Sequence, residues 1–245
     1  MEDGPLGPGE VRVWLARPGA WPRGLAPEAL LDDADRDAVA RLRAAGARRA
    51  RATARALLRA ALSHAVAGAV APADWRFRRP GGRPEVEAPE AGCHLAVSAS
   101  HTEGLVACAV SRAGAVGVDV EWTGRRLRPL ALAERFFAPA ERDALRALPE
   151  PERPAHFLAL WTAKEAFAKA RGEGLAATGL ARIRVAGVGS GAPRLAPDAA
   201  LGEPAAAWHL HLQAPDAEHL LAVAVRCGPA RPRLRVAHAA QLPSR

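Results

Sequence analysis

The sequence predicts an α+β fold, and three observations support this prediction. Long stretches rich in alanine, leucine and arginine lack proline and are typical of helices, whereas shorter stretches alternate apolar and polar residues, as strands do. Turns rich in glycine and proline separate them. Residues 1–112 and 113–226 share one plan, in which a strand is followed by a long helix and then by further strands. This coarse plan divides the chain into a first subdomain at 1–112, a second at 113–226 and a tail at 227–245, but the letters alone do not establish a repeat.

The first subdomain is expected to contain strands around one long helix. Asp32, Asp33 and Asp35 are candidate N-caps, since carboxylates accept hydrogen bonds from the first free amides of a helix. Leu57, Leu58 and Leu62 recur at helical spacing and should face the core. The expected elements are a strand at 10–16, a helix at 36–69 that is continuous or divided at Gly46, a strand at 75–77 and a hairpin at 93–111.

The second subdomain should begin with a strand and then place a short helix before a long one. Pro139 suits the first turn of the short helix, and Gly172 suits the end of the long one. Phe157 and Leu160 should be core residues. The expected elements are strands at 115–122, 181–188, 207–213 and 220–226, helices at 139–147 and from about Ala155 to Gly172, and a last strand at 233–238 in the tail.

Composition excludes several classes of function. The 34 basic and 26 acidic residues give a formal charge of +8, which favours phosphorylated ligands or acidic proteins. No helix-turn-helix, zinc finger or aromatic RNA-binding signature is present, so we expect no nucleic-acid partner. The three cysteines form no Cys-x-x-Cys pair and indicate reduced, structural thiols. No secretory leader or membrane-spanning apolar run is present, which predicts a soluble, cytoplasmic protein, expected to be monomeric.

Lysine occurs at only two positions among the 34 basic residues, Lys164 and Lys169. Both lie in Trp161-Thr162-Ala163-Lys164-Glu165-Ala166-Phe167-Ala168-Lys169. Lysine carries a compact point charge and arginine a planar fork, so this preference indicates a site that requires an ammonium group. The alternative is an ordinary solvated helix face, on which Glu165 and Lys169 form an i,i+4 pair.

Two carboxylates project from one face of the strand Ala115-Val116-Gly117-Val118-Asp119-Val120-Glu121-Trp122. Side chains alternate across a strand, so Asp119 and Glu121 lie on the side opposite the valines. Gly117 beside them is expected to let a ligand approach the backbone. Paired carboxylates suit Mg²⁺, which takes oxygen ligands and shares its site with phosphates. The alternative is two solvated charges on an edge strand.

Together these segments resemble the paired signature of the 4′-phosphopantetheinyl transferases, and the longer, surfactin-type subfamily is the closer match. Gly82-Arg83-Pro84 is similar to the Gly-Lys-Pro of that family, and Ser98-Ala99-Ser100-His101-Thr102 to its Asn-x-Ser-His-Ser segment. The order and spacing of the four segments agree over roughly residues 36 to 180. The resemblance implies two similar α+β subdomains related by a pseudo-twofold axis, with the active site in the cleft between them.

The resemblance also assigns roles to residues. It implies Mg²⁺ at Asp119, Glu121 and Glu165, catalytic roles for Glu165, Lys169 and His101, and coenzyme A as co-substrate. The arginine expected at the 3′-phosphate aligns with Ala50, so its neighbours Arg49 and Arg51 are the candidates. The full set of residues expected to bind coenzyme A is Arg49, Arg51, Gly82, Arg83, Ser100, His101, Lys164 and Lys169.

The implied reaction transfers 4′-phosphopantetheine from coenzyme A to a serine hydroxyl of an acyl, peptidyl or polyketide carrier protein and releases adenosine 3′,5′-bisphosphate. Carrier proteins are usually acidic, which agrees with a basic enzyme. The pathway would be fatty acid or secondary metabolite synthesis. Glu165 would act as general base or only as a metal ligand, and the sequence leaves both open. The alternatives are a Mg²⁺-dependent phosphodiesterase or nuclease, and a basic nucleic-acid-binding module.

Overall fold

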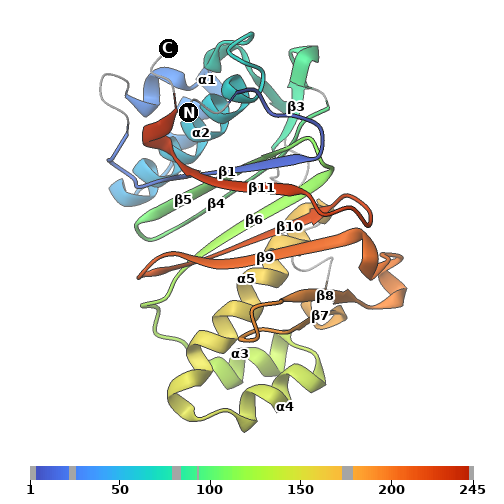
Figure 1. Cartoon of the computed structure of the whole chain (residues 1–245). Coiled ribbons are helices and arrows are strands. Elements are labelled where there is room, and N and C mark those ends of the chain that lie inside the picture. Colours follow the sequence, from blue (N-terminus) through green and yellow to red (C-terminus); the bar gives the residue numbers. More distant parts are fainter. Residues whose placement is uncertain (1–3, 22–25, 79–83, 93, 173–178, 243–245) are drawn as a thin grey trace.

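The computed structural model describes residues 4–21, 26–78, 84–92, 94–172 and 179–242. Two β-sheets pack face to face at its centre. Helix α2 (Ala45–Ala65) covers the outer face of one sheet, and helix α5 (Arg153–Arg171) covers the outer face of the other (Figure 1). This layered arrangement of helices and separate sheets confirms the predicted α+β class.

The first sheet has the strand order β11-β1-β5-β4. β11 runs parallel to β1, and the other neighbours are antiparallel. The strand expected in the tail therefore joins the sheet that the first part of the chain forms. The strands are β1 (Glu10–Ala16), β4 (Ala96–Thr102), β5 (Leu105–Ser111) and β11 (Arg233–His238).

The second sheet has the order β6-β10-β9, and all neighbours are antiparallel. This order matches β1-β5-β4 of the first sheet, and in both a long helix follows the first strand. The repeated topology agrees with two related halves, while the pseudo-twofold axis itself stays a prediction. The strands are β6 (Ala115–Trp122), β9 (Trp208–Asp216) and β10 (His219–Arg226).

Smaller elements surround these layers. Three of them, β3, α3 and β8, were not expected from the sequence. No helix of the described residues combines the length and the apolar character that crossing a bilayer requires. The smaller elements are α1 (Asp33–Ala40), β2 (Arg76–Arg78), β3 (Glu85–Ala88), α3 (Pro129–Phe136), α4 (Pro139–Ala147), β7 (Ile183–Ala186) and β8 (Arg194–Pro197).

The helix expected at 36–69 is two helices, and the break lies at residues 41–44, before Gly46. Asp32 caps α1 by accepting a hydrogen bond from the Asp35 amide at 2.8 Å. The Arg48 guanidinium donates to the carbonyls of Leu42 and Arg43 at 2.9 and 2.8 Å. Side-chain donors therefore satisfy the backbone carbonyls of the break, which a continuous helix would have paired internally.

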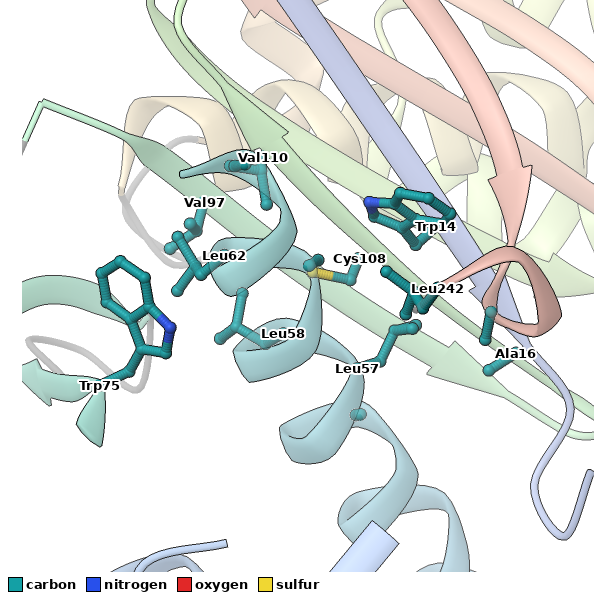
Figure 2. Close-up of a cluster of buried hydrophobic side chains, with 14 of the residues drawn as sticks. Trp14, Ala16, Leu57, Leu58, Leu62, Trp75, Val97, Cys108, Val110 and Leu242 are labelled. Carbon is teal, nitrogen blue, oxygen red and sulfur yellow. The ribbon is translucent and has the colours of Figure 1, made fainter. Parts of the chain in front are cut away.

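Three apolar layers hold the sheets and helices together. In the first, Leu57, Leu58 and Leu62 of α2 pack against Trp14 and Cys108 of the first sheet (Figure 2). The second fills the space between the sheets and contains the three alternating valines of β6. The third lies between α5 and the second sheet, and it includes Phe157 and Leu160, as predicted.

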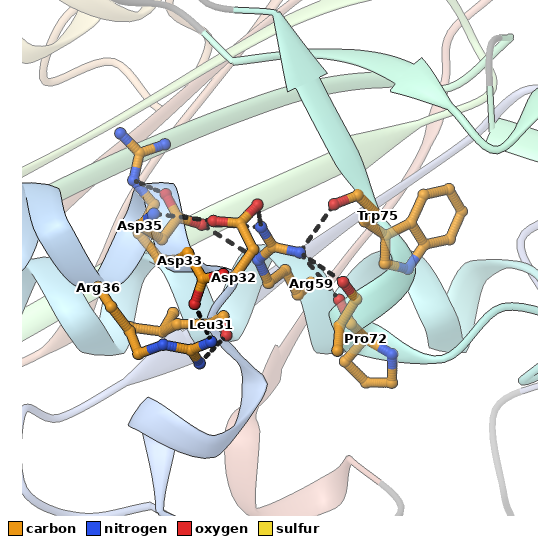
Figure 3. Close-up of polar contacts among 10 residues, drawn as sticks. Leu31, Asp32, Asp33, Asp35, Arg36, Arg59, Pro72 and Trp75 are labelled. Carbon is orange, nitrogen blue, oxygen red and sulfur yellow. Dashed lines mark hydrogen bonds and ion pairs between the residues drawn. The ribbon is translucent and has the colours of Figure 1, made fainter.

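A buried ionic network fixes α2 to α1 (Figure 3). The Arg59 side chain has no solvent exposure and donates to Asp35 Oδ2 at 2.9 Å and to Asp32. It also donates to the Trp75 carbonyl at 2.8 Å. Arg55, one turn earlier, forms an ion pair with Asp35. Because every acidic member of the network has a cationic partner, the burial of these charges is compensated and α2 is held in one position.

Candidate active site

The carboxylate strand β6 has the predicted alternation. Val116, Val118 and Val120 are buried between the two sheets. The opposite face of β6 meets α5, and there a Cβ added at Gly117 would lie 1.9 Å from the Ala166 carbonyl oxygen. The expectation that Gly117 admits a ligand is therefore wrong, because helix α5 takes that space. The glycine lets α5 approach the strand closely.

Asp119 is the most enclosed of the three predicted metal-binding carboxylates, with 4% exposure. Its Oδ1 accepts hydrogen bonds from Ser100 Oγ at 2.7 Å and from Lys169 Nζ at 2.7 Å. Lys169 Nζ also donates to Ser100 Oγ at 2.9 Å. Asp119 Oδ2 is buried and makes no hydrogen bond with the part of the chain that the structure describes. Three elements, β4, β6 and α5, therefore converge on one carboxylate.

Glu121 and Glu165 lie close enough to Asp119 to affect each other's ionisation. Burial, together with the negative charges of Asp119 and Glu121, raises the pKa of Glu165 to about 7, while Lys169 and Arg125 oppose the shift. Burial also raises the pKa of Glu121, against the hydrogen bond from Arg125 at 2.6 Å. Burial and neighbouring negative charge disfavour the ionised forms of Glu121 and Glu165, so these two groups and Asp119 together form an electrostatic site for a cation.

The residues present fit Mg²⁺ by their chemistry. The donors are hard carboxylate oxygens, and the buried Asp119 Oδ2 makes no hydrogen bond with the described residues. In the structure two cationic side chains contact these carboxylates, Lys169 at Asp119 and Arg125 at Glu121. No three acidic, histidine or cysteine side chains among the described residues are gathered closely enough to ligate one ion. The predicted ligand set Asp119, Glu121 and Glu165 therefore stays a prediction.

His101 is the next-to-last residue of β4 and lies just before the turn of the predicted hairpin. The turn contains only Glu103 and Gly104. Because side chains alternate along a strand, His101 lies on the opposite face of β4 from Ser100. It shares that face with Val97, which packs against α2. Burial and the positive charges of Arg51 and Lys169 lower the pKa of His101. The lowered pKa favours the uncharged ring, which keeps one N–H group that can donate a hydrogen bond.

The two candidate arginines of α2 have different environments. Arg49 is exposed, whereas Arg51 is partly buried and its Nε makes no hydrogen bond with the described residues. The effect of Arg51 on His101 places its charge near the end of β4. Gly82 and Arg83, both expected to bind coenzyme A, lie outside the described residues.

Lys164 has a structural role, which corrects the prediction that it binds coenzyme A. Its side chain has no solvent exposure. The ammonium donates to Glu141 Oε2 at 2.5 Å and to the carbonyls of Leu180 and Ile183 at 2.9 and 2.5 Å. An ammonium has three N–H donors, and all three are used here. The signal in the sequence was that Lys164 shares a helix face with Phe157 and Leu160, which are core residues.

A row of hydroxyl groups joins the two sheets beside the site, which sequence reasoning missed. Ser98 Oγ accepts a hydrogen bond from the Val118 amide at 3.0 Å, and Thr102 Oγ1 accepts one from the Trp122 amide at 3.2 Å. Ser100, between them, donates to Asp119. Edge strands β4 and β6 are thus joined through side chains on every second residue of β4. The signal was the alternation of hydroxyl residues at 98, 100 and 102.

Comparison with known proteins gives one family. Residues 115–224 match the model of the 4′-phosphopantetheinyl transferase superfamily. The chain is 36% identical over 135 residues to the 4′-phosphopantetheinyl transferase HetI of Nostoc sp., covering 54% of this chain and 52% of HetI. It is 41% identical over 78 residues to the 4′-phosphopantetheinyl transferase psf-1 of Bacillus pumilus, covering 31% of each protein. The resemblance drawn from the motifs is confirmed.

These matches are partial. The chain spans about half the length of HetI and about a third of psf-1. Among solved structures, it is similar to a holo-(acyl-carrier-protein) synthase of Bacillus anthracis in complex with CoA (3′,5′-ADP), with 24% identity and a TM-score of 0.39. That match covers 45% of this chain and 93% of the synthase.

Proposed function

We propose that this chain, whose residues 115–224 belong to the 4′-phosphopantetheinyl transferase superfamily, transfers 4′-phosphopantetheine from coenzyme A to a serine hydroxyl of a carrier protein. Adenosine 3′,5′-bisphosphate is the second product. The observation that carries this proposal is that Ser100, Asp119 and Lys169 lie within hydrogen-bonding distance of one another. Glu165 precedes Lys169 by one turn of helix α5. Such a site offers both carboxylates for a metal ion and donors for a pyrophosphate.

The donors of the site would bind the pyrophosphate and the nucleotide. Ser100, His101 and Lys169 come from β4 and α5 and would donate to the pyrophosphate oxygens. Arg49 or Arg51, at the start of α2, would contact the 3′-phosphate, and the partial burial of Arg51 near His101 favours it. By the family pattern, Gly82 and Arg83 would contact the nucleotide. Donors that are already positioned lose little entropy when the substrate binds.

Asp119, Glu121 and Glu165 would hold Mg²⁺. The raised pKa of Glu165 supports this role, because a cation would relieve the repulsion among the three carboxylates. When bound, Mg²⁺ supplies positive charge to the oxygens of the pyrophosphate, where negative charge develops as the bond breaks. Lys169 would add its ammonium charge to the same oxygens.

Glu165 would also take the proton of the attacking serine hydroxyl. A carboxylate with a pKa near 7 is a stronger base than an ordinary one, which suits proton transfer at neutral pH. The chain itself needs no nucleophile, because the serine comes from the partner. The role of base and the role of ligand differ in the pH dependence of the transfer rate.

The partner would be an acidic acyl, peptidyl or polyketide carrier protein. The formal charge of +8 favours such a partner, since opposite charges speed the encounter of two proteins. We propose that the enzyme acts as a soluble, cytoplasmic monomer. The nuclease alternative has no support, because the relatives named above are phosphopantetheinyl transferases.

Intact-protein mass spectrometry tests this function. Apo carrier proteins of the acyl and peptidyl types are incubated with the enzyme, coenzyme A and Mg²⁺. The expected result is a gain of one phosphopantetheine mass, which EDTA prevents and excess Mg²⁺ restores. No gain on any carrier, together with calorimetric binding of coenzyme A, would refute the transfer. Transfer that continues at the same rate in EDTA would refute only the proposed requirement for Mg²⁺.

A further inference from the structure

The ion pair between Lys169 and Asp119 connects the two kinds of ligand that the site is proposed to bind. Lys169 Nζ lies 2.7 Å from Asp119 Oδ1 and 2.9 Å from Ser100 Oγ. Asp119 is a proposed ligand of the cation, and Lys169 a proposed ligand of the pyrophosphate. In the structure the two are each other's partners. Neither can serve its proposed ligand fully while the ion pair persists.

Asp119 leaves little room for a second cation beside the ammonium. Its side chain is 6% exposed, and Oδ1 already accepts two hydrogen bonds, from Ser100 and Lys169. Only Oδ2 makes no hydrogen bond with the described residues. A divalent ion at Oδ2 would lie close to the ammonium, in surroundings that screen charge poorly. The repulsion between the two would favour departure of the ammonium.

Lys169 is able to move, whereas the other lysine is not. The Lys169 side chain is 29% exposed, and its hydrogen bonds with the part of the chain that the structure describes are made at its tip, to Asp119 and Ser100. Its four-carbon stem lets the ammonium turn while the helix stays in place. The Lys164 side chain is fully enclosed, and its three acceptors use all of its donors.

Movement of Lys169 would bring its charge to the phosphate donors. The Lys169 charge also lowers the pKa of His101, so the ammonium and that ring lie within electrostatic reach of each other. An ammonium that leaves Asp119 exposes the carboxylate and adds a free positive charge beside Ser100. Both changes favour the ligands proposed for this site.

We infer that Lys169 is an exchangeable counter-ion of Asp119, which a divalent cation displaces toward the pyrophosphate of coenzyme A. This inference rests on the proposed function for the identity of the anion. Binding of the cation and of the anion would then be coupled, because each removes one partner of the same ion pair. Such coupling is reciprocal, so coenzyme A would also raise the affinity for the metal.

Nuclear magnetic resonance can follow the exchange directly, since the chain has only two lysines. Protein labelled with ¹³C- and ¹⁵N-lysine gives two sets of side-chain signals, and Lys169→Met identifies which belongs to Lys169. Addition of Mg²⁺ without coenzyme A should shift the Cε and Nζ signals of Lys169 and leave those of Lys164 in place. Unchanged Lys169 signals at a Mg²⁺ concentration that saturates Asp119 would overturn the inference.

Metal affinity provides a second test that does not depend on activity. Mn²⁺ binding to the full chain without coenzyme A is measured by electron paramagnetic resonance. Lys169→Met should bind Mn²⁺ about 10-fold more tightly than the wild type, because no ammonium has to leave Asp119. Arg51→Met is the matched control: it removes one nearby charge that touches none of the carboxylates, and it should change the affinity by less than about 2-fold. Equal effects of the two substitutions would overturn the inference.

The two tests separate this inference from the proposed function. If Mn²⁺ binds the wild type too weakly to measure, binding gained in Lys169→Met supports the exchange, and no gain overturns it. If the protein transfers phosphopantetheine but its Lys169 signals do not respond to Mg²⁺, the proposed function is supported and the exchange of Lys169 is contradicted. If Mg²⁺ shifts the Lys169 signals but no phosphopantetheine is transferred, the exchange is supported and the proposed function is contradicted.

Discussion

The Lys164 ammonium lies 2.5 Å from Glu141 Oε2 in the interior of the protein, and 4.7 Å from the centre of the Phe137 ring. This ion pair joins α5 to the start of α4. Glu141 also accepts a hydrogen bond from the Val185 amide at 2.9 Å, so it connects β7 as well. Every donor of Lys164 and both oxygens of Glu141 are used, which compensates the cost of burying the two charges.

Lys164→Met should therefore destabilise the fold. Removal of one partner leaves a buried carboxylate without its counter-charge, which typically costs about 3–5 kcal/mol. The control is Arg146→Met, which breaks an exposed ion pair with Glu134 and should cost less than about 1 kcal/mol. Guanidinium chloride denaturation of both variants measures the difference. Equal midpoints for the two variants would contradict the structural role of Lys164.

Asp119→Asn should abolish transfer and keep the fold. Asparagine has the same shape and still accepts a hydrogen bond from Ser100, but it loses the charge that the metal and Lys169 require. We expect the transfer rate to fall about 100-fold or more, as for other removed charge-stabilising groups. The matched control is Asp143→Asn on α4, whose side chain is 71% exposed. A thermal melt near that of the wild type would show an intact fold, and full activity would refute the metal site.

Lys169→Met should reduce turnover more than Arg49→Met does. Lys169 is proposed to act on the pyrophosphate, where charge develops, so its loss should lower kcat. Arg49 is exposed on α2 and is a candidate for the 3′-phosphate, which does not react, so its loss should chiefly raise KM for coenzyme A. Steady-state kinetics of the two variants test this order. A larger loss of turnover in Arg49→Met than in Lys169→Met would contradict the binding of the pyrophosphate by Lys169.

The stability of the protein in EDTA should fall as the pH rises from about 5 to about 8. The folded-state pKa of Glu165 is raised to about 7 from the ordinary 4.5. The folded protein therefore keeps a proton that the unfolded chain has already lost, and this contribution disappears as the pH passes through 7. Glu165→Gln should flatten the pH dependence of the melting temperature. A slope that persists in this variant would assign the effect to another group.

Most of the fold could be predicted because its periodicity is local. The alternation of β6 and the strand at 233–238 were read from the sequence and are confirmed. The pairing of β11 with β1 could not be read in this way, since it joins residues more than 200 positions apart. The break between α1 and α2 was misplaced for a similar reason: the carbonyls that Arg48 satisfies are visible only in three dimensions.

Lys164 and Lys169 belong to one sequence motif but have different roles in the structure. Both ammonium groups form ion pairs with carboxylates, but the Lys164 side chain is fully buried and the Lys169 side chain is partly exposed. They are five residues apart, which on a helix places them about 140° from each other. One therefore faces the core and pairs with Glu141, and the other faces Asp119 and Ser100. Glu141 was not predicted as a partner, because its role depends on how α4 packs against α5.

The most direct test of the account is to measure adenosine 3′,5′-bisphosphate and holo carrier protein in the same reaction. Chromatography quantifies the nucleotide, and mass spectrometry quantifies the modified carrier. We expect one nucleotide for each phosphopantetheine transferred, since the proposed transfer breaks a bond within the pyrophosphate of coenzyme A. Release of a different nucleotide, or of nucleotide without modified carrier, would contradict transfer and indicate hydrolysis instead.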